Sequence, residues 1–175
     1  MSIERPLAPD PYDLLPEVPS FSLSSTDIGE GEPIADRFTP KGENISPQLS
    51  WSGAPAETKS FVVTCFDPDA PTPSGYWHWT VANLPASVTS LDTGAGAGND
   101  ALPGSAVHAR TDGGALAWEG PNPPEGDREH RYMFAVHALD VEEIDVDENT
   151  SPAVVAFQCV FHTIARARLT GVCQR

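Results

Sequence analysis

The chain has 175 residues, and its 25 acidic residues against 10 basic ones give a net charge of −15. One well-buried core fits this length, whereas two ordinary domains do not. Charge of this sign repels a phosphate backbone at long range, which excludes nucleic acid as an expected partner and argues against broad adsorption to acidic membranes.

The sequence also bears on location and on disulfides. No stretch approaches the roughly 20 consecutive apolar residues of a membrane span. The N-terminus is Pro-rich and acidic, where a signal peptide would be basic and then apolar. We therefore expect a cytoplasmic protein with no integral membrane segment. Cys65, Cys159 and Cys173 lack a C-x-x-C spacing, so neither a disulfide framework nor a zinc knuckle is predicted, and the first two stand in apolar runs typical of a core.

Residues 1–20 are interpreted as a Pro-rich N-terminal extension and residues 21–175 as the folded domain. The extension carries Pro6, Pro9, Pro11, Pro16 and Pro19 among acidic residues. Such a composition buries little surface, so the extension is expected to lie extended over the domain or to move freely.

From residue 21 on, short β-type runs alternate with Pro, Gly and Asp, a spacing typical of an all-β sandwich or barrel. The predicted strands are 21–23, 48–51, 60–66, 76–84, 106–110 and 131–139. Strands 60–66 and 131–139 are apolar at both alternating positions, as expected of central strands covered on both sides.

One helix is predicted near the C-terminus. Ser151 is a suitable N-cap, Pro152 suits the first helical position, and Gly171 is expected to end the helix. An apolar stripe then follows one face, which we expect to lie on the sheet. The stripe consists of Val154, Phe157, Phe161 and Ile164, with Arg168 on the same face.

Three segments place polar or ionisable side chains beside rigid backbone at the ends of predicted strands. They are D-P-D-A-P at 67–71, G-Y-W-H-W at 75–79, and G-P-N-P-P-E-G at 120–126 followed by H-R-Y at 130–132. Prolines stiffen the first and third segments, and Gly120 and Gly126 allow the backbone to approach a ligand closely. The aspartates of the first segment are either functional or simple caps of their turn.

Strand alternation assigns His78 to the face of Tyr76 and Thr80, and it assigns Trp77 and Trp79 to the other face, where they are expected to pack. A protonated imidazole can donate to an anion, although a lone histidine in an apolar strand is more often a core residue. If the three segments converge, Asp67, His78 and His130 form a compact cluster beside Tyr76 and Tyr132. Spacing alone leaves that convergence open.

These segments resemble the phosphatidylethanolamine-binding proteins, specifically the small bacterial and archaeal branch described as Raf-kinase-inhibitor-like. The resemblance covers residues 21–172. It rests on N-I-S-P at 44–47 with Leu49 and Trp51, on D-P-D-A-P, on W-H-W at 77–79 with N-L-P at 83–85, and on G-x-x-P-P-x-G with H-R-Y.

The resemblance implies a mainly β fold, a Greek-key β-sandwich with short helices and a C-terminal helix. It also implies a pocket that takes phosphate, acetate, cacodylate or phospholipid head groups, and it implies no cofactor and no metal. Carried over residue by residue, the ligand-binding positions are Asp67, Tyr76, His78, Gly120, Pro124, His130 and Tyr132. His78 is matched through its spacing to Asn83. The D-R-E at 127–129 departs from the pattern, and this acidic pair is expected to disfavour large anions at the pocket rim.

The leading hypothesis is a binding module, in which imidazole and backbone N–H donors hold a phosphate-like anion while Asp67 orients one histidine. An enzyme that uses His78 and His130 for acid/base chemistry is an alternative, although the sequence contains no G-x-S-x-G or H-E-x-x-H motif. A metal site built from Asp67 and the same histidines is a weaker alternative, because the resemblance speaks against it.

Family members are described as inhibitors of kinases or serine proteases, so a kinase or protease partner is a further alternative. Analogy with bacterial relatives also suggests a homodimer.

Overall fold

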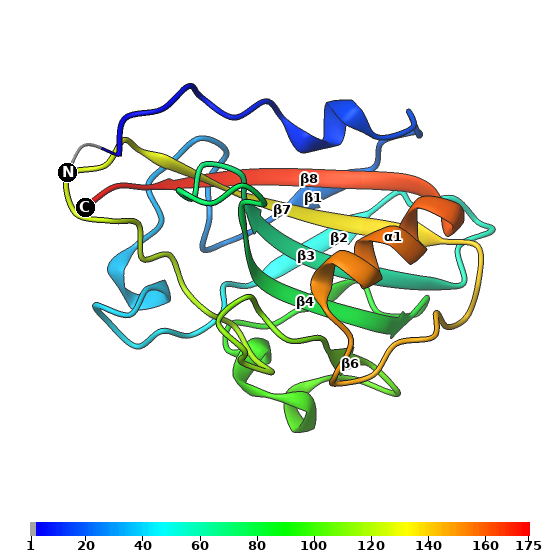
Figure 1. The fold of residues 1–175 in the computed structure, drawn as a ribbon. Helices are drawn as coiled ribbons and strands as arrows, with labels where there is room; N and C mark the ends of the chain where they lie inside the picture. Colours follow the sequence, from blue (N-terminus) through cyan, green and yellow to red (C-terminus); the bar gives the residue numbers. More distant parts are fainter. Residues whose placement is uncertain (1–2) are drawn as a thin grey trace.

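Two antiparallel sheets pack against each other in the computed structural model, which describes residues 3–175 (Figure 1). The smaller sheet has the strand order β1-β2-β5, and the larger sheet has the order β6-β4-β3-β7-β8. The strands are β1 (Ser22–Ser24), β2 (Leu49–Ser52), β3 (Ser60–Asp67), β4 (Tyr76–Pro85), β5 (Ser90–Leu91), β6 (Val107–His108), β7 (His130–Leu139) and β8 (Thr163–Cys173). The described residues also form α1 (Pro152–His162) and the short 3-10 helices η1 (Pro11–Leu14), η2 (Asp36–Phe38), η3 (Ala95–Ala97) and η4 (Asn99–Ala101).

The larger sheet has Greek-key connectivity. β3, β4 and β6 lie side by side across the sheet in the order of the chain, which forms β5 of the smaller sheet between β4 and β6. The chain then returns past them and places β7 on the other side of β3, where β8 pairs with it. The predicted mainly β sandwich with a helix near the C-terminus is therefore confirmed.

β3 and β7 lie in the middle of the larger sheet, each with a partner strand on both sides. Every residue of β3 is buried, and β7 is buried except at Arg131. One face of the sheet packs against the smaller sheet, and the other is covered by α1 and the N-terminal segment. The two central strands are thus confirmed, and the buried free thiols of Cys65 and Cys159 agree with prediction.

The predicted helix is too long, because α1 ends at His162 and the next residues form β8 along the whole of β7. In β8 the buried Ala165, Ala167 and Leu169 alternate with more exposed residues, which is the period of a half-buried strand. Pairing with β8 also gives β7 hydrogen-bond partners that a helix could not supply. The Thr163 backbone N–H donates to the Cys159 carbonyl at the end of α1, and the Thr163 hydroxyl donates to the same carbonyl at 2.7 Å.

Gly171 does not end a helix. It lies opposite Tyr132 in the β7–β8 ladder, where a Cβ atom would stand 2.7 Å from Cγ1 of Ile34. The glycine is therefore required by close packing between the sheet and the segment that carries Ile34.

The apolar stripe predicted to face the sheet does not do so. Val155 and Cys159 are buried beneath α1, whereas Phe157 and Phe161 are 64% and 65% exposed. The two phenylalanine rings contact each other with centroids 5.1 Å apart. Apolar residues follow helical spacing on both faces of α1. The face of Val155 and Cys159 has the smaller side chains and therefore allows α1 to approach the sheet more closely than the face of the two phenylalanines would.

A β-bulge changes the faces of β4. Cys65 pairs with Trp79 and Phe66 pairs with Trp77, so His78 is an extra residue outside the ladder. Trp79 is therefore buried in the core between the sheets, whereas Trp77 contacts Phe66 on the opposite face, with tilted rings whose centroids lie 4.5 Å apart. The prediction that both tryptophans share one face is wrong, because simple alternation fails at the bulge.

The N-terminal segment runs along β8 (Figure 1), and its η1 helix packs on the outer face of the larger sheet. Tyr12 is only 8% exposed and packs against Met133 and Ala135, and Arg168 donates to Asp10 at 2.9 Å. The segment thus lies over the domain, but it buries an aromatic ring that its composition did not predict. Within residues 3–175, none of the helices has the length and hydropathy that crossing a bilayer requires.

Candidate functional site

The ends of β3, β4 and β7 and the loop 120–126 surround a polar pocket of about 290 Å³. The structure brings all seven residues named from the resemblance into its lining, together with others that the sequence did not single out. The full lining is Asp67, Ala70, Pro71, Thr72, Tyr76, His78, Glu119, Gly120, Asn122, Pro123, Pro124, His130 and Tyr132.

Asp67 ends β3 with its carboxylate buried. Its Oδ1 accepts from the Asp69 backbone N–H at 2.7 Å, and its Oδ2 lies 2.7 Å from Nδ1 of His130. Asp67 therefore caps its turn and orients the histidine at once. Asp69 instead pairs with Arg131 at 2.7 Å and takes no part in the pocket lining.

His130 is fully enclosed, and both of its ring nitrogens contact carboxylates. Nδ1 bonds Asp67, and Nε2 lies 2.9 Å from Oδ2 of Asp127. Burial opposes the charged ring, but the two carboxylates outweigh burial and raise the pKa of His130 above its usual value. An imidazolium that donates from both nitrogens is thus favoured, with no donor left for a ligand.

Asp127 belongs to the segment expected to form an acidic rim, but it is buried and points inward. Its carboxylate pairs with Arg5 of the N-terminal segment at 2.8 Å. The Arg5 guanidinium, and then His130, hold the pKa of Asp127 well below its usual range. The charge of Asp127 is therefore compensated on two sides, and the expected repulsion of large anions at the rim stays a prediction.

The two ring nitrogens of His78 differ, because only one of them has a hydrogen-bond partner among the described residues. Its Nδ1 lies 2.7 Å from the Glu119 carbonyl, so Nδ1 carries the hydrogen. Its Nε2 has no hydrogen-bond partner among residues 3–175. Burial lowers the pKa of His78, against the opposing effect of the Glu119 carbonyl, so the ring is mainly neutral near pH 7. Tyr76 and Tyr132 flank the ring with centroid distances of 4.8 and 5.0 Å.

The Tyr132 hydroxyl is a second polar group without a partner. It is fully buried and makes no hydrogen bond to any described residue. Burial, and then the nearby Asp67 carboxylate, raise the pKa of Tyr132, so the phenol keeps its proton. An uncompensated buried hydroxyl of this kind costs about 1–3 kcal/mol, which a ligand oxygen would recover if it displaced the atoms that cover the hydroxyl.

Glu119 lines the pocket and was missed in the sequence. Its Oε1 accepts from the Tyr76 hydroxyl at 2.8 Å and its Oε2 from the Thr111 hydroxyl at 2.6 Å. The available signal was its position directly before Gly120 in a loop already selected. Glu119 brings a negative charge to the side of the pocket that carries Tyr76.

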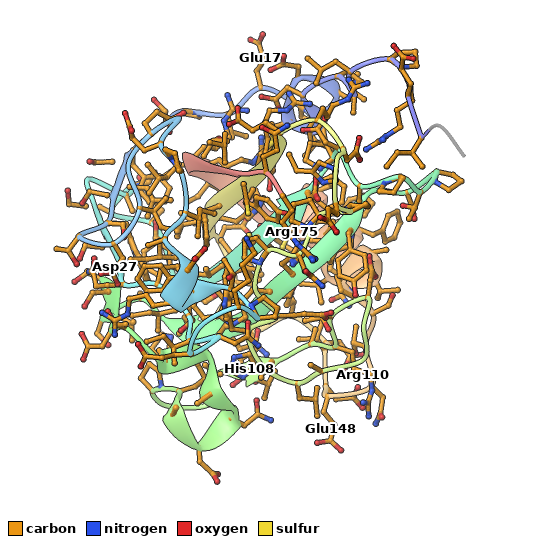
Figure 2. The ribbon with its side chains drawn as sticks, turned by 90° about the vertical axis from the view of Figure 1, so that its left-hand side faces the viewer. Glu17, Asp27, His108, Arg110, Glu148 and Arg175 are labelled. Carbon is orange, nitrogen blue, oxygen red and sulfur yellow. The ribbon has the colours of Figure 1, made fainter. Side chains whose placement is uncertain are left out.

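Gly120 is required by packing rather than by a ligand. A Cβ atom there would stand 2.5 Å from Oδ1 of Asn44 and would also meet the Phe38 carbonyl. Asn44 Oδ1 accepts from the Gly120 N–H at 3.0 Å, which explains the N-I-S-P segment as a support of the pocket wall. The C-terminal residue holds the same loop on the face shown in Figure 2, because the Gly126 N–H donates to the Arg175 carbonyl at 2.8 Å and the Arg175 side chain bonds Asn122.

The described residues hold no group of three or more His, Cys, Asp and Glu side chains arranged for a metal ion. The pocket instead offers one imidazole nitrogen and one phenol without partners, next to the carboxylates of Asp67 and Glu119. Such a mixture of donors and negative charge suits a small polar ligand better than it suits a metal ion.

A Greek-key β-sandwich with a polar pocket at one end of its larger sheet defines a class of β-sandwich ligand-binding proteins. The family model described as "Phosphatidylethanolamine-binding protein" matches residues 24–174. The chain therefore belongs to the phosphatidylethanolamine-binding protein family.

Relatives support the same assignment. The UPF0098 protein YbhB of Escherichia coli is 49% identical over 157 residues, which cover 87% of this chain and 99% of YbhB. YbcL of the same organism is 46% identical, with 87% of each chain covered. The crystal structure of E. coli YbcL, described as a new member of the mammalian family, superposes with a TM-score of 0.86 over 89% of this chain and 99% of that one, at 45% identity.

Proposed function

We propose that this protein binds a phosphate-like group or a phospholipid head group in the pocket between β3, β4 and β7. The observation that carries the proposal is the unpartnered Nε2 of His78 in a pocket that Tyr132 also lines. Once protonated, His78 can donate to a phosphoryl group, and the buried, unpartnered Tyr132 hydroxyl can donate to the same group when the ligand displaces the atoms that cover it.

Binding of an anion by His78 requires a proton. The lone pair of a neutral Nε2 repels an oxyanion, and burial keeps the pKa of His78 low in the free protein. The proton must therefore enter with the ligand, either from solvent or as a P–OH group. For an anion that does not titrate, affinity then falls by up to about tenfold per pH unit, because one proton is taken up on binding.

The carboxylates in the lining favour a zwitterion over a bare anion. Glu119 and Asp67 stand beside the two donors, so an ammonium group on the ligand would meet negative charge while the phosphoryl group meets the donors. Phosphoethanolamine has this arrangement of charges, and we expect it to bind more tightly than inorganic phosphate.

The test is calorimetric titration of phosphoethanolamine, inorganic phosphate, sulfate and a short-chain phosphatidylethanolamine at pH 6 and pH 8. Sulfate does not titrate in this range and so isolates protons taken up by the protein. We expect phosphoethanolamine to bind, and sulfate to bind more weakly at pH 8. A phospholipid that binds far more tightly than its head group would assign the physiological ligand to a lipid, and equal affinities would assign it to a free phosphate compound.

Tyr132→Phe and His78→Gln are the informative variants. Tyr132→Phe removes only the unpartnered hydroxyl, so the fold is kept and affinity is expected to fall about tenfold. His162→Gln changes a histidine outside the pocket and serves as the matched control. Unchanged affinity in both pocket variants, or absence of binding by the wild type, would refute the proposal.

The acid/base alternative uses the same residue, because a neutral imidazole with a free Nε2 is also what a general base requires. The ³¹P NMR spectrum of phosphoethanolamine or the phospholipid during incubation separates the two functions. A spectrum without new resonances supports a binding protein, and a new resonance that His78→Gln abolishes would make it an enzyme. A cytoplasmic location, a homodimer and a kinase or protease partner stay predictions.

A further inference from the structure

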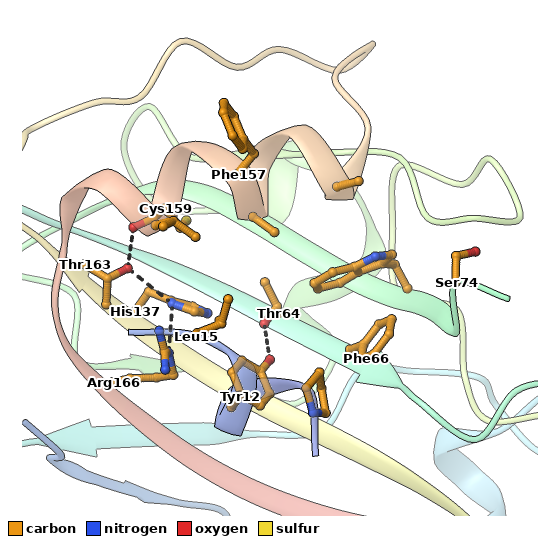
Figure 3. A pocket seen from close by; sticks show the side chains of 15 residues that line it. Tyr12, Leu15, Thr64, Phe66, Ser74, His137, Phe157, Cys159, Thr163 and Arg166 are labelled. Atoms are coloured by element: carbon orange, nitrogen blue, oxygen red, sulfur yellow. Dashed lines mark hydrogen bonds between the residues drawn. The ribbon is translucent and has the colours of Figure 1, made fainter. Parts of the chain in front are cut away.

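A second cavity lies on the other face of the larger sheet, between that sheet, α1 and the η1 segment (Figure 3). Its volume is about 330 Å³, at the low end of the roughly 300–1,000 Å³ range of small-molecule sites. Strand alternation separates the two cavities, since Asp67 lines the first and its neighbour Phe66 lines the second.

The walls of this cavity are apolar and partly aromatic. The sheet contributes Phe66 and Trp77, whose rings contact each other at a tilt of 45° and form one wall. α1 contributes the small side chains of Ala153 and Ala156 opposite, and η1 contributes the ring of Tyr12. The slot between an aromatic pair and two alanines has room for a flat ring, which prefers offset contact with other rings.

One end of the cavity is polar and positively charged. Arg166 is the single lining residue with a permanent charge, and no carboxylate within residues 3–175 pairs with it. Its guanidinium lies 5.3 Å from the Tyr12 ring centroid, and Arg168, another cation, lies close enough to repel it. An unpaired guanidinium beside apolar walls is unusual in a chain with a net charge of −15.

His137 lies at the same end and is only 6% exposed. Its Nδ1 lies 3.5 Å from Arg166 Nε, which can only donate, and 3.4 Å from the hydroxyl of Thr163, whose hydrogen is already donated to the Cys159 carbonyl. The two contacts call for opposite roles of Nδ1, and Nε2 has no hydrogen-bond partner among the described residues. Figure 3 shows the imidazole between Thr163 and Arg166, close to Tyr12 and Leu15.

We propose that this cavity is a second binding site, which takes an aromatic carboxylate. Its carboxylate would bond the Arg166 guanidinium, and its ring would lie between the alanines of α1 and the Phe66–Trp77 pair. Charge complementarity selects an anion, and the slot selects a flat apolar body. The site is independent of the phosphate pocket, because the two cavities share no lining residue.

The test is titration of the full chain with 2-naphthoate and its neutral isostere 2-naphthamide at pH 8, followed by calorimetry. We expect saturable 1:1 binding of naphthoate, with naphthamide at least about tenfold weaker, because the charged hydrogen bonds are lost. Arg166→Gln is expected to weaken naphthoate about tenfold or more, whereas Arg166→Lys keeps the charge and most of the affinity. Arg37→Gln, an exposed arginine outside the cavity, is the matched control.

Ala156→Phe fills the slot without touching the charge and should abolish naphthoate binding while leaving phosphoethanolamine binding unchanged. It also keeps the proposal testable if Arg166→Gln fails to fold. Equal affinity for naphthoate and naphthamide, or naphthoate affinity unchanged in Arg166→Gln or Ala156→Phe, would overturn the proposal. The proposal would also be overturned if naphthoate did not bind and the protein formed a concentration-dependent dimer that Ala156→Phe dissociates. That result would assign the cavity to a second copy of the chain.

Discussion

Both ring nitrogens of His130 bond carboxylates, Nδ1 to Asp67 and Nε2 to Asp127, and Arg5 balances the second of these charges. The four groups form a compensated network behind the pocket. His130 therefore shapes the pocket wall, and the donors left for a ligand are those of His78 and Tyr132.

Asp127→Asn tests this division of roles. The two carboxylates raise the pKa of His130, so loss of one is expected to bring that pKa down. A pH titration of the His130 ring resonances by NMR measures the change, and Asp140→Asn, an exposed carboxylate beside another histidine, is the control. The pKa of His130 is higher in the folded than in the unfolded protein, so protonation of His130 favours the folded state. This contribution to the free energy of unfolding is complete below about pH 6.5 and is lost as the pH rises through the raised pKa. An unchanged His130 titration in Asp127→Asn would show that the network does not set its charge.

His108 predicts the opposite pH dependence. It is completely buried, its Nε2 has no partner, and burial lowers its pKa to about 4. Its neutral form is therefore the native one, so stability is full above about pH 6.5 and falls with pH towards 4, by up to about 1.4 kcal/mol per unit.

His108→Phe should remove this contribution and flatten the acid side of the stability profile, measured as the free energy of unfolding in urea between pH 7 and pH 4.5. At pH 7 the loss of the bond to Asn99 and the removal of the unpartnered Nε2 oppose each other, so stability should change by about 1 kcal/mol or less. An acid slope equal to that of the wild type would mean that His108 gains a proton without cost.

At the scale of elements, the sequence predicts strands well where burial is complete and fails where two patterns compete. β3 and β7 are apolar on both faces, a pattern that a central strand explains directly. The segment after His162 kept helical spacing among its larger side chains while its alanines followed strand alternation. Pairing with β7 favours the strand over the helix, and no nearby sequence feature predicts that pairing.

Gly171→Ala tests the assignment of this segment to β8. The added methyl would meet the Ile34 side chain at 2.7 Å, so we expect a loss of roughly 1–3 kcal/mol, measured by urea unfolding. Ile34→Ala removes the clashing atoms, and the double variant should therefore be more stable than the sum of the two single losses predicts. Strict additivity would show that Gly171 is not packed against Ile34.

The N-terminal segment is an element that composition underestimates. Tyr12 fills a site on Met133 and Ala135, and no feature of the Pro-rich sequence identifies a docking surface on a sheet formed much later in the chain.

Tyr12→Ala is expected to destabilise the protein by roughly 2–4 kcal/mol, because a buried aromatic ring is lost. Leu14→Ala, at a position that is 75% exposed in the same helix, should change stability by less than about 0.5 kcal/mol. Thermal or urea unfolding of the two variants measures the difference. Equal effects would mean that the segment is not docked through Tyr12.

Across the whole molecule, the fold brings distant segments together at the end of β3. Convergence of Asp67, His78 and His130 depends on a Greek-key return of the chain, so spacing alone could not establish it. The motifs nevertheless named residues that all line one pocket. Glu119 and Arg5 were not found, and Asp127 was noted only as part of an acidic rim, because their roles come from contacts that join the loop, the N-terminus and the sheet.

The same architecture gives each face of the larger sheet its own cavity, with alternate residues of β3 pointing into them. The pocket lined by His78 carries the compensated charges of His130 and its partners and an imidazole nitrogen that donates only when protonated, whereas the second cavity carries one uncompensated cation. The two faces are therefore expected to select different anions.

The central claim is that His78 receives a proton when a phosphoryl group enters the pocket. The most direct measurement is the ¹⁵N NMR signal of the His78 ring at pH 7, recorded before and after saturation with phosphoethanolamine. We predict that Nε2 changes from an unprotonated to a protonated nitrogen while Nδ1 keeps its hydrogen bond to the Glu119 carbonyl. Saturable binding with Nε2 still unprotonated would contradict the account.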